Sequence, residues 1–213
     1  MNLFSTKFLL FLFVLFAFSI TATAQTFYGT TDVEVFREGR TKEFRNKEES
    51  PLKDEDFTAF KELNYFPVDK KFRVEADFTR IVAEKYFQMP TSSGKAKKFI
   101  KFGILKFQLN GKNYSLIVYQ ADADVLAKFP EYKDLLFVPF KDATNGKETY
   151  GGGRYIDIKI LSGKKVILDF NLAYNPSCAY GSDRYSCPIP PKENFLKAEI
   201  KAGEKTYQYS TAK

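Results

Sequence analysis

The sequence predicts a mainly β protein: a single antiparallel β-rich domain, either a sandwich or a partly open barrel, with one or two N-terminal helices. Apolar residues recur at every second position after about residue 70, as in half-buried strands. Turn signals such as Asn110-Gly111 separate these runs, and no regular alternation of strands with crossover helices indicates a parallel sheet. With 23 Phe and 13 Tyr, the chain has enough large rings to fill such a core.

The first 24 residues have the pattern of a secretory signal peptide. A single cation, Lys7, precedes an apolar run over residues 8–18, and Ala22-Thr23-Ala24 offers a small-residue cleavage site before Gln25. The run is too short to span a bilayer comfortably. We expect cleavage after Ala24, a mature domain of residues 25–213 that is not an integral membrane protein, and export to the periplasm or the extracellular space. The alternative is an uncleaved N-terminal anchor.

The composition excludes several classes of site. The chain has no histidine, so catalytic triads and metal centres that need imidazole are excluded. Its net charge is +7, but acidic and basic residues are interspersed, which indicates a solvated surface rather than a nucleic-acid groove. We expect no nucleic-acid partner. The sequence identifies neither a cofactor nor an oligomeric state.

The first half of the domain changes from helical to strand periodicity. Charged residues with recurring apolar positions over residues 30–63 predict one or two helices, and Ser50-Pro51 suits the start of the second. Strict alternation over residues 72–78 predicts a half-buried strand. Residues 98–101 form the next predicted strand, after a polar break.

The second half contains the strongest local signals. The alternating runs 105–109 and 114–118 flank Asn110-Gly111 and predict a β-hairpin. Residues 122–132 predict a short helix capped by an aspartate and interrupted at Pro130. The remaining predicted strands are residues 135–140, 154–160, 165–171 and 195–200.

The strands on either side of Gly163 are predicted to pair as a second hairpin. A three-residue loop keeps their apolar residues on one face, whereas a two-residue loop would scatter them over both. In this register Asp157 stands opposite Asp169, and Tyr155 stands opposite Asn171. Two carboxylates directly across a strand pair repel each other, so we expect a cation, an arginine or a shared proton between them.

Two unusual segments flank the predicted second hairpin. Gly151-Gly152-Gly153 precedes it, and such backbone can approach a ligand or present N–H groups to an anion. The alternative is a glycine bulge or bend at the strand entry. After the hairpin, Cys178 and Cys187 are predicted to form a disulfide in an oxidising compartment. A metal-binding thiol pair and a nucleophilic cysteine are the alternatives.

Several collinear blocks resemble a known family. They are Ser50-Pro51-Leu52, Tyr65-Phe66-Pro67, Thr91-Ser92, Glu148 to Tyr155, Asp169-Phe170-Asn171, Ala173-Tyr174-Asn175-Pro176, Cys178-Ala179-Tyr180, Ser186-Cys187-Pro188 and Pro191 to Asn194. From about residue 37 to residue 205, the chain resembles domain of unknown function 1684, a bacterial and archaeal family without an assigned activity. The resemblance implies that the glycine block, Glu148 to Tyr155, and the block with Asn175, Pro176 and Cys178 are the characteristic parts. It supplies no catalytic residue.

Three functional interpretations follow. The favoured one is a pocket for a small polar ligand, lined by Glu148, Tyr150, Gly152, Arg154, Tyr155, Asp157, Asp169, Asn171, Tyr174 and Asn175. The second is a carboxylate- or metal-dependent hydrolase, with Asp157 and Asp169 as an acid–base pair or as a hard-cation site completed by Glu148 and Asn171. The third is a purely structural or interaction domain, in which Arg154 and nearby lysines neutralise both aspartates.

Overall fold

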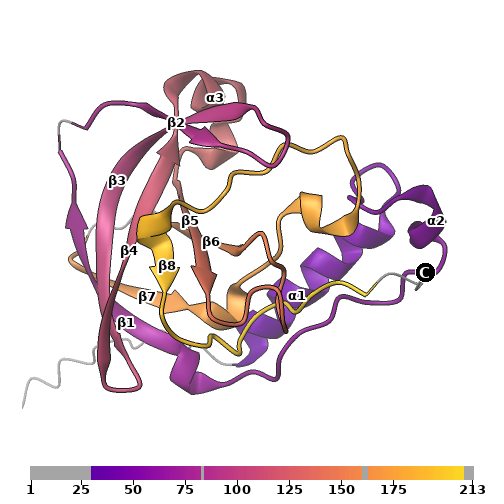
Figure 1. The fold of residues 1–213 in the computed structure, drawn as a ribbon, viewed down its shortest axis with the longest axis horizontal. Coiled ribbons are helices and arrows are strands. Elements are labelled where there is room, and N and C mark those ends of the chain that lie inside the picture. The colour runs from indigo at the N-terminus through magenta and orange to yellow at the C-terminus, as the bar shows by residue number, and fades with distance from the viewer. Residues whose placement is uncertain (1–29, 83, 160–162, 209–213) are drawn as a thin grey trace, which may run out of the picture.

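The computed structural model describes residues 30–82, 84–159 and 163–208. Eight strands of this part form one sheet that curls into a half-barrel (Figure 1). The fold is therefore mainly antiparallel β with few helices, as predicted, and it is closer to the open barrel than to the sandwich. The predicted signal peptide lies outside the described residues.

The main path of the sheet contains six antiparallel strands. Their order is β6 (Arg154–Lys159), β5 (Leu135–Asp142), β4 (Lys112–Ala121), β3 (Ala96–Leu109), β1 (Arg73–Arg80) and β7 (Lys165–Asp169). Two short strands lie off this path. The strand β2 (Phe87–Pro90) pairs with β3, and β8 (Phe195–Leu196) runs parallel to β5.

The helices are short except for the first. They are α1 (Thr30–Arg45), α2 (Asp54–Phe57) and α3 (Ala123–Lys128), with 3-10 turns η1 (Lys70–Phe72), η2 (Pro130–Tyr132), η3 (Phe170–Leu172), η4 (Ser177–Tyr180) and η5 (Lys192–Asn194). The predicted helix start at Ser50-Pro51 is wrong, because α2 begins at Asp54. The Ser50 hydroxyl oxygen instead accepts a hydrogen bond from the backbone N–H of Leu52. None of the helices in the described ranges combines the length and apolar character of a membrane span.

The strongest local predictions are confirmed. The strands β3 and β4 form the hairpin, with Leu109 opposite Lys112 and positive φ angles of 50° at Asn110 and 73° at Gly111. The helix α3 is capped by Asp122, whose carboxylate accepts the amide of Val125 at 3.0 Å. These features depend on contacts between near neighbours in the chain.

The predicted second hairpin is wrong in its pairing. The strands β6 and β7 form, but β6 pairs with β5 and β7 pairs with β1, so they lie at opposite ends of the sheet order. Each strand thereby gains a longer partner than the other could offer. The curl of the sheet then brings β6 beside the segment after β7, where Tyr155 and Tyr174 exchange two backbone hydrogen bonds of 2.9 and 3.0 Å.

The even-numbered residues of β4, β5 and β6 face the main core. Leu116, Leu136 and Ile156 are buried there, in a cluster that also contains Leu168 of β7. The apolar face predicted for β6 and β7 is thus confirmed, although the predicted pairing of these two strands with each other is wrong. The odd-numbered residues of β4 to β6 face the opposite side of the sheet.

A β-bulge moves β3 from one face to the other. The register of β3 against β4 shifts between Lys101 and Gly103. Before the shift Phe99 packs with Tyr119, and after it Leu105 lies in the main core. The extra residue at a bulge reverses the alternation, so one strand contributes side chains to both faces.

Candidate functional site

A pocket of about 720 Å³ lies on the face of the sheet opposite the main core. Eight of its lining residues carry aromatic rings: Phe99, Tyr119, Phe129, Tyr132, Phe137, Tyr155, Tyr174 and Tyr185. The other lining residues are Lys97, Lys98, Ala121, Val125, Leu135, Asp157, Pro176, Ser177, Ser186, Cys187 and Pro188. We call this cavity the aromatic pocket.

Strand register places the floor of the aromatic pocket. Tyr119 of β4 stands opposite Phe137 of β5, and Phe137 stands opposite Asp157 of β6. Directly opposed residues project from the same face of a sheet, with Cβ atoms about 5 Å apart. The three side chains therefore form one row across three strands, and Asp157 ends the row at the edge of the sheet.

The rings of the floor are in continuous contact. Phe99 stacks on Phe137 with ring centroids 5.6 Å apart, and Phe137 meets Tyr155 edge-to-face at 4.7 Å. Tyr155 in turn meets Tyr174 edge-to-face at 5.8 Å. Such ring pairs favour these geometries because the positive edge of one ring approaches the negative face of another. The floor is thus an extended, largely apolar surface.

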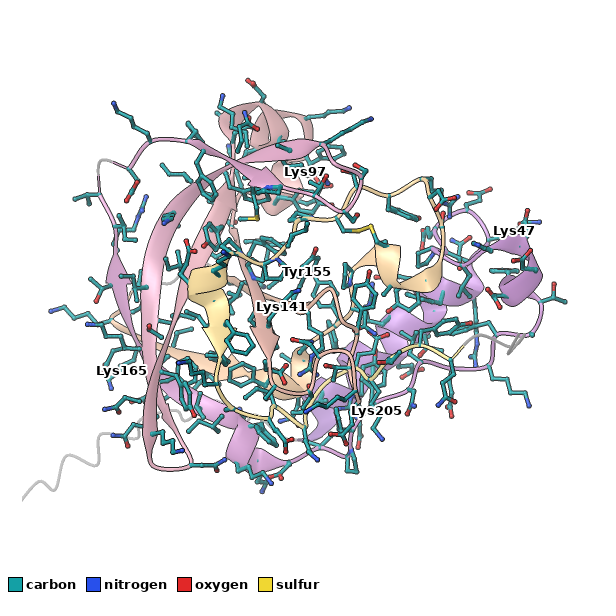
Figure 2. All side chains as sticks on the ribbon, in the orientation of Figure 1. Lys47, Lys97, Lys141, Tyr155, Lys165 and Lys205 are labelled. Carbon is teal, nitrogen blue, oxygen red and sulfur yellow. A yellow bond between two sulfur atoms is a disulfide. The ribbon has the colours of Figure 1, made fainter. Side chains whose placement is uncertain are left out.

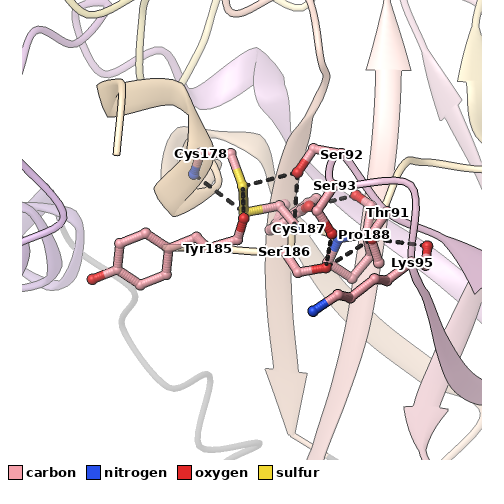
Figure 3. Close-up of a disulfide and its surroundings, with 10 residues drawn as sticks. Thr91, Ser92, Ser93, Lys95, Cys178, Tyr185, Ser186, Cys187 and Pro188 are labelled. Atoms are coloured by element: carbon pink, nitrogen blue, oxygen red, sulfur yellow. Dashed lines mark hydrogen bonds between the residues drawn. A yellow bond between two sulfur atoms is a disulfide. The ribbon is translucent and has the colours of Figure 1, made fainter. Parts of the chain in front are cut away.

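A disulfide fastens the segment that forms the opposite wall. Cys178 and Cys187 are bonded, as predicted, and Ser92 contacts both residues from the turn before β3 (Figure 3). Closing so short a loop contributes about 2.5–3 kcal/mol on the chain-entropy model. The hydroxyl of Tyr155 also donates to the carbonyl of Pro188, which ties the floor to this wall.

Asp157 is the acidic group of the aromatic pocket. Its Oδ2 accepts the Tyr174 hydroxyl at 2.6 Å, and its Oδ1 has no hydrogen-bond partner among the described residues. The residue is exposed to the pocket, yet the surrounding walls crowd the carboxyl group. Burial therefore raises the pKa of Asp157, although the Tyr174 hydrogen bond and the charge of Arg40 oppose that rise.

Two lysines lie at the β3 end of the aromatic pocket. Lys98 pairs with Asp122 at 3.8 Å, whereas Lys97 makes no ion pair with a described residue. Burial lowers the pKa of Lys97. In Figure 2 Lys97 lies close to β2, and Tyr155 lies nearer the centre of the molecule. The two ends of the pocket therefore differ in charge.

Three of the predicted ligand contacts line the aromatic pocket: Tyr155, Asp157 and Tyr174. The predicted opposition of Asp157 and Asp169 is wrong, because the two residues belong to different strand pairs. Asp169 instead accepts the backbone and side-chain amides of Asn171, both at 2.8 Å. The proposed acid–base pair therefore does not form, and individual catalytic roles for these residues stay predictions.

Arg154 is a buried structural clamp in this fold. Its guanidinium pairs with Asp142 at 2.8 Å and donates to the carbonyls of Ile200, Ala202 and Glu204. Both charged side chains are fully buried. Of these carbonyls, only that of Ile200 belongs to the predicted strand over residues 195–200, and the structure reduces that strand to the two residues of β8.

The glycine block forms a bend that packing requires. At Gly153, φ is +97° and a Cβ would lie 2.7 Å from Cγ of Pro190. A Cβ at Gly152 would collide with the ring of Tyr150. Both observations match the alternative interpretation of this block as a bend at the strand entry. Glu148 pairs with Lys201 at 3.0 Å outside the aromatic pocket.

Asn171 and Asn175 also hold backbone in place. Asn171 exchanges two hydrogen bonds of 3.0 Å with the backbone of Asp69. The amide of Asn175 donates to buried Glu204 at 3.0 Å, and its side chain donates to the carbonyl of Lys205 at 2.7 Å. Neither residue lines the aromatic pocket. Across the described ranges, no group of three or more Cys, Asp or Glu is arranged to hold a metal ion.

Sequence reasoning missed the floor residues Phe99, Tyr119 and Phe137. None of the three was among the predicted ligand contacts, because an aromatic side chain on a strand is usually buried. A signal was present: in the predicted strand 135–140, Phe137 lies on the face opposite Leu136 and Val138. Apolar residues on both faces of a strand indicate that both faces are covered.

Replacing Arg154 with Met should lower the free energy of unfolding by about 3–5 kcal/mol, because it leaves the buried Asp142 carboxylate without its cation. Urea denaturation measures this change. Lys201→Met is the matched control, since its pair with Glu148 is exposed and should contribute less than about 1 kcal/mol. Equal effects of the two substitutions would contradict the role of Arg154 as a clamp.

Replacing Asp157 with Asn should change how stability depends on pH. The folded state holds the Asp157 proton more tightly than the unfolded chain, whose carboxyl has a pKa of about 3.9. The stabilising contribution of the Asp157 carboxyl group is therefore fully present below the unfolded-chain pKa. It is lost as the pH rises through the raised pKa of the folded state. Asn still accepts the Tyr174 hydroxyl but carries no such charge.

The free energy of unfolding of Asp157→Asn should therefore improve relative to the wild type as the pH rises above the unfolded-chain pKa of about 3.9. Urea titrations at several pH values measure the difference. Tyr174, Tyr155 and Arg40 are the other ionisable groups that act on or respond to Asp157, and they are unchanged in the variant. A difference that is constant with pH would show that burial does not perturb this carboxyl group.

Comparison with known proteins identifies the family. Residues 58–205 match the model of DUF1684, described as a protein of unknown function. The solution NMR structure of an uncharacterized protein from Haloarcula marismortui is similar, with a TM-score of 0.65 and 36% identity over 83% of this chain and 94% of that chain. No curated protein matches. The chain therefore belongs to the DUF1684 family of proteins of unknown function.

Proposed function

We propose that this protein binds a small organic molecule with a flat apolar part and a polar group in the aromatic pocket. The continuous ring floor formed by Phe99, Phe137, Tyr155 and Tyr174 is the observation that carries the proposal. Ligand sites are usually concave, mostly apolar and equipped with a few polar groups that fix orientation. The aromatic pocket has this composition, and Asp157 supplies a polar group at its edge.

This proposal retains the small ligand predicted from the sequence but assigns it to a site lined mostly by other residues. Of the two blocks first considered, Glu148 to Tyr155 contributes Tyr155 and Asp169 to Asn175 contributes Tyr174. The remaining surface comes from β3, β4, β5, Asp157 of β6, the segment of α3 and η2, and the disulfide segment. A ligand in this pocket would therefore gain most of its binding free energy from ring contacts, with polar groups setting its orientation.

We also propose that the protein is exported. The order of Lys7, the apolar run and Ala22-Thr23-Ala24 supports this, and so does a disulfide, because such bonds persist in oxidising compartments. Expression in a bacterium with a secretory pathway should yield a mature chain that begins at Gln25, as determined by N-terminal sequencing. An intact N-terminus in the cell interior would contradict export.

Ligand binding is tested with a panel of small ring compounds, including indole and substituted benzenes, by thermal shift and two-dimensional NMR. Binding compounds should raise the melting temperature and perturb amides of β4, β5 and β6. Phe137→Leu keeps an apolar side chain but removes the central ring, and should weaken binding by about two- to tenfold, the value of a ring pair.

The matched control is Phe195→Leu, which removes a ring that is 48% exposed and does not line the aromatic pocket. Binding in this variant should equal that of the wild type. If no ring compound binds, or if both substitutions weaken binding equally, the aromatic pocket is not the site.

A further inference from the structure

The aromatic pocket has a charge at its edge that the ring floor does not explain. The Oδ1 atom of Asp157 has no hydrogen-bond partner among the described residues, while Oδ2 accepts the Tyr174 hydroxyl at 2.6 Å. The Tyr174 bond fixes the orientation of the carboxylate without using its second oxygen. An accessible acceptor is therefore held in place beside the rings.

The rings next to Asp157 suit a cation. Phe137 stands directly opposite Asp157 in the sheet, and Tyr155 contacts both Phe137 and Tyr174. Aromatic faces attract ammonium groups, more strongly where water is partly excluded. A carboxylate supplies the opposite charge and a hydrogen-bond acceptor. Together these groups can surround an ammonium group on more than one side.

The lysines of the pocket lie far from this carboxylate. Lys101 belongs to the same row across the sheet as Asp157, and Lys97 is four residues further along β3. Three strand spacings of about 4.8 Å and four residues at a rise of about 3.3 Å put the backbone of Lys97 and Asp157 on the order of 20 Å apart along the sheet. Physiological salt screens charges beyond about 8 Å.

Arg40 is the nearer cation, and it does not compete for the site. Its guanidinium lies over the ring of Tyr174 at 5.0 Å and pairs with Glu43 at 2.9 Å. Arg40 does not line the aromatic pocket. Burial raises the pKa of Asp157, and the positive charge of Arg40 opposes that rise, which favours the ionised form that binds an ammonium group.

We propose that the aromatic pocket selects amines: a ring of the ligand packs on Phe137 and Tyr155, and its protonated amino group donates to Oδ1 of Asp157. This inference rests on the proposed ring-binding function and adds the class of ligand. Selection for an anion by Lys97 is the competing outcome, and a matched series of ligands separates the two.

The series is 2-phenylethylamine, 2-phenylethanol and 3-phenylpropionate, which share a ring and differ in the charge at the end of the chain. Isothermal titration at neutral pH measures each affinity for the full mature chain. The amine should bind about tenfold or more tightly than the alcohol, because a charge-assisted hydrogen bond replaces a neutral one. The carboxylate should bind most weakly.

Asp157→Asn should remove the preference of the amine over the alcohol while leaving alcohol binding in place. Glu199→Gln is the matched control, because it removes an equal charge from an exposed residue that does not line the pocket, and it should keep the preference. The wild-type series alone decides the question if Asp157→Asn is too unstable to titrate.

Each outcome separates this inference from the ring-binding proposal. Equal binding of amine and alcohol by the wild type overturns amine selection but leaves ring binding intact. If 3-phenylpropionate binds most tightly of the three, amine selection is overturned in favour of anion selection by Lys97. If none of the three ligands binds, and the wider ring panel also fails, then ring binding and amine selection fall together.

Discussion

The buried guanidinium of Arg154 holds together the parts of the chain that shape the aromatic pocket. From the first residue of β6 it binds Asp142 at the end of β5 and three carbonyls of the C-terminal segment. That segment presents Glu204, which accepts the amide of Asn175 and the hydroxyl of Tyr180. A charge buried this deeply must be paired and hydrogen-bonded, so this network allows little variation in geometry.

The second organising feature is the closure of the curled sheet. The backbone exchange between Tyr155 and Tyr174 joins the β6 edge to the segment after β7. The same two residues then contribute their rings to the pocket floor. Structure and candidate function therefore use different atoms of the same residues: main chain for closure, side chains for the pocket.

Prediction from sequence succeeded where neighbouring residues decide the outcome. The Asn110-Gly111 hairpin and the Asp122 cap follow from backbone preferences within a few residues. The Cys178–Cys187 disulfide was also predicted, because only two cysteines are present. The pairing of β6 with β7 failed because strands adjacent in sequence need not be adjacent in a sheet. Arg154 and Asn171 were read as ligand contacts, yet both satisfy buried backbone groups.

The sequence by itself determined the apolar face of β6 and β7, where the tight turns lie and which family the blocks resemble. These are properties of local order, since side-chain alternation and turn geometry depend on nearby residues. Only the tertiary structure decided which strands pair, that Asp157 meets Tyr174 rather than Asp169, and that Phe99, Tyr119 and Phe137 form the floor of a pocket. Those contacts join residues far apart in the chain, and the curl of the whole sheet brings them together.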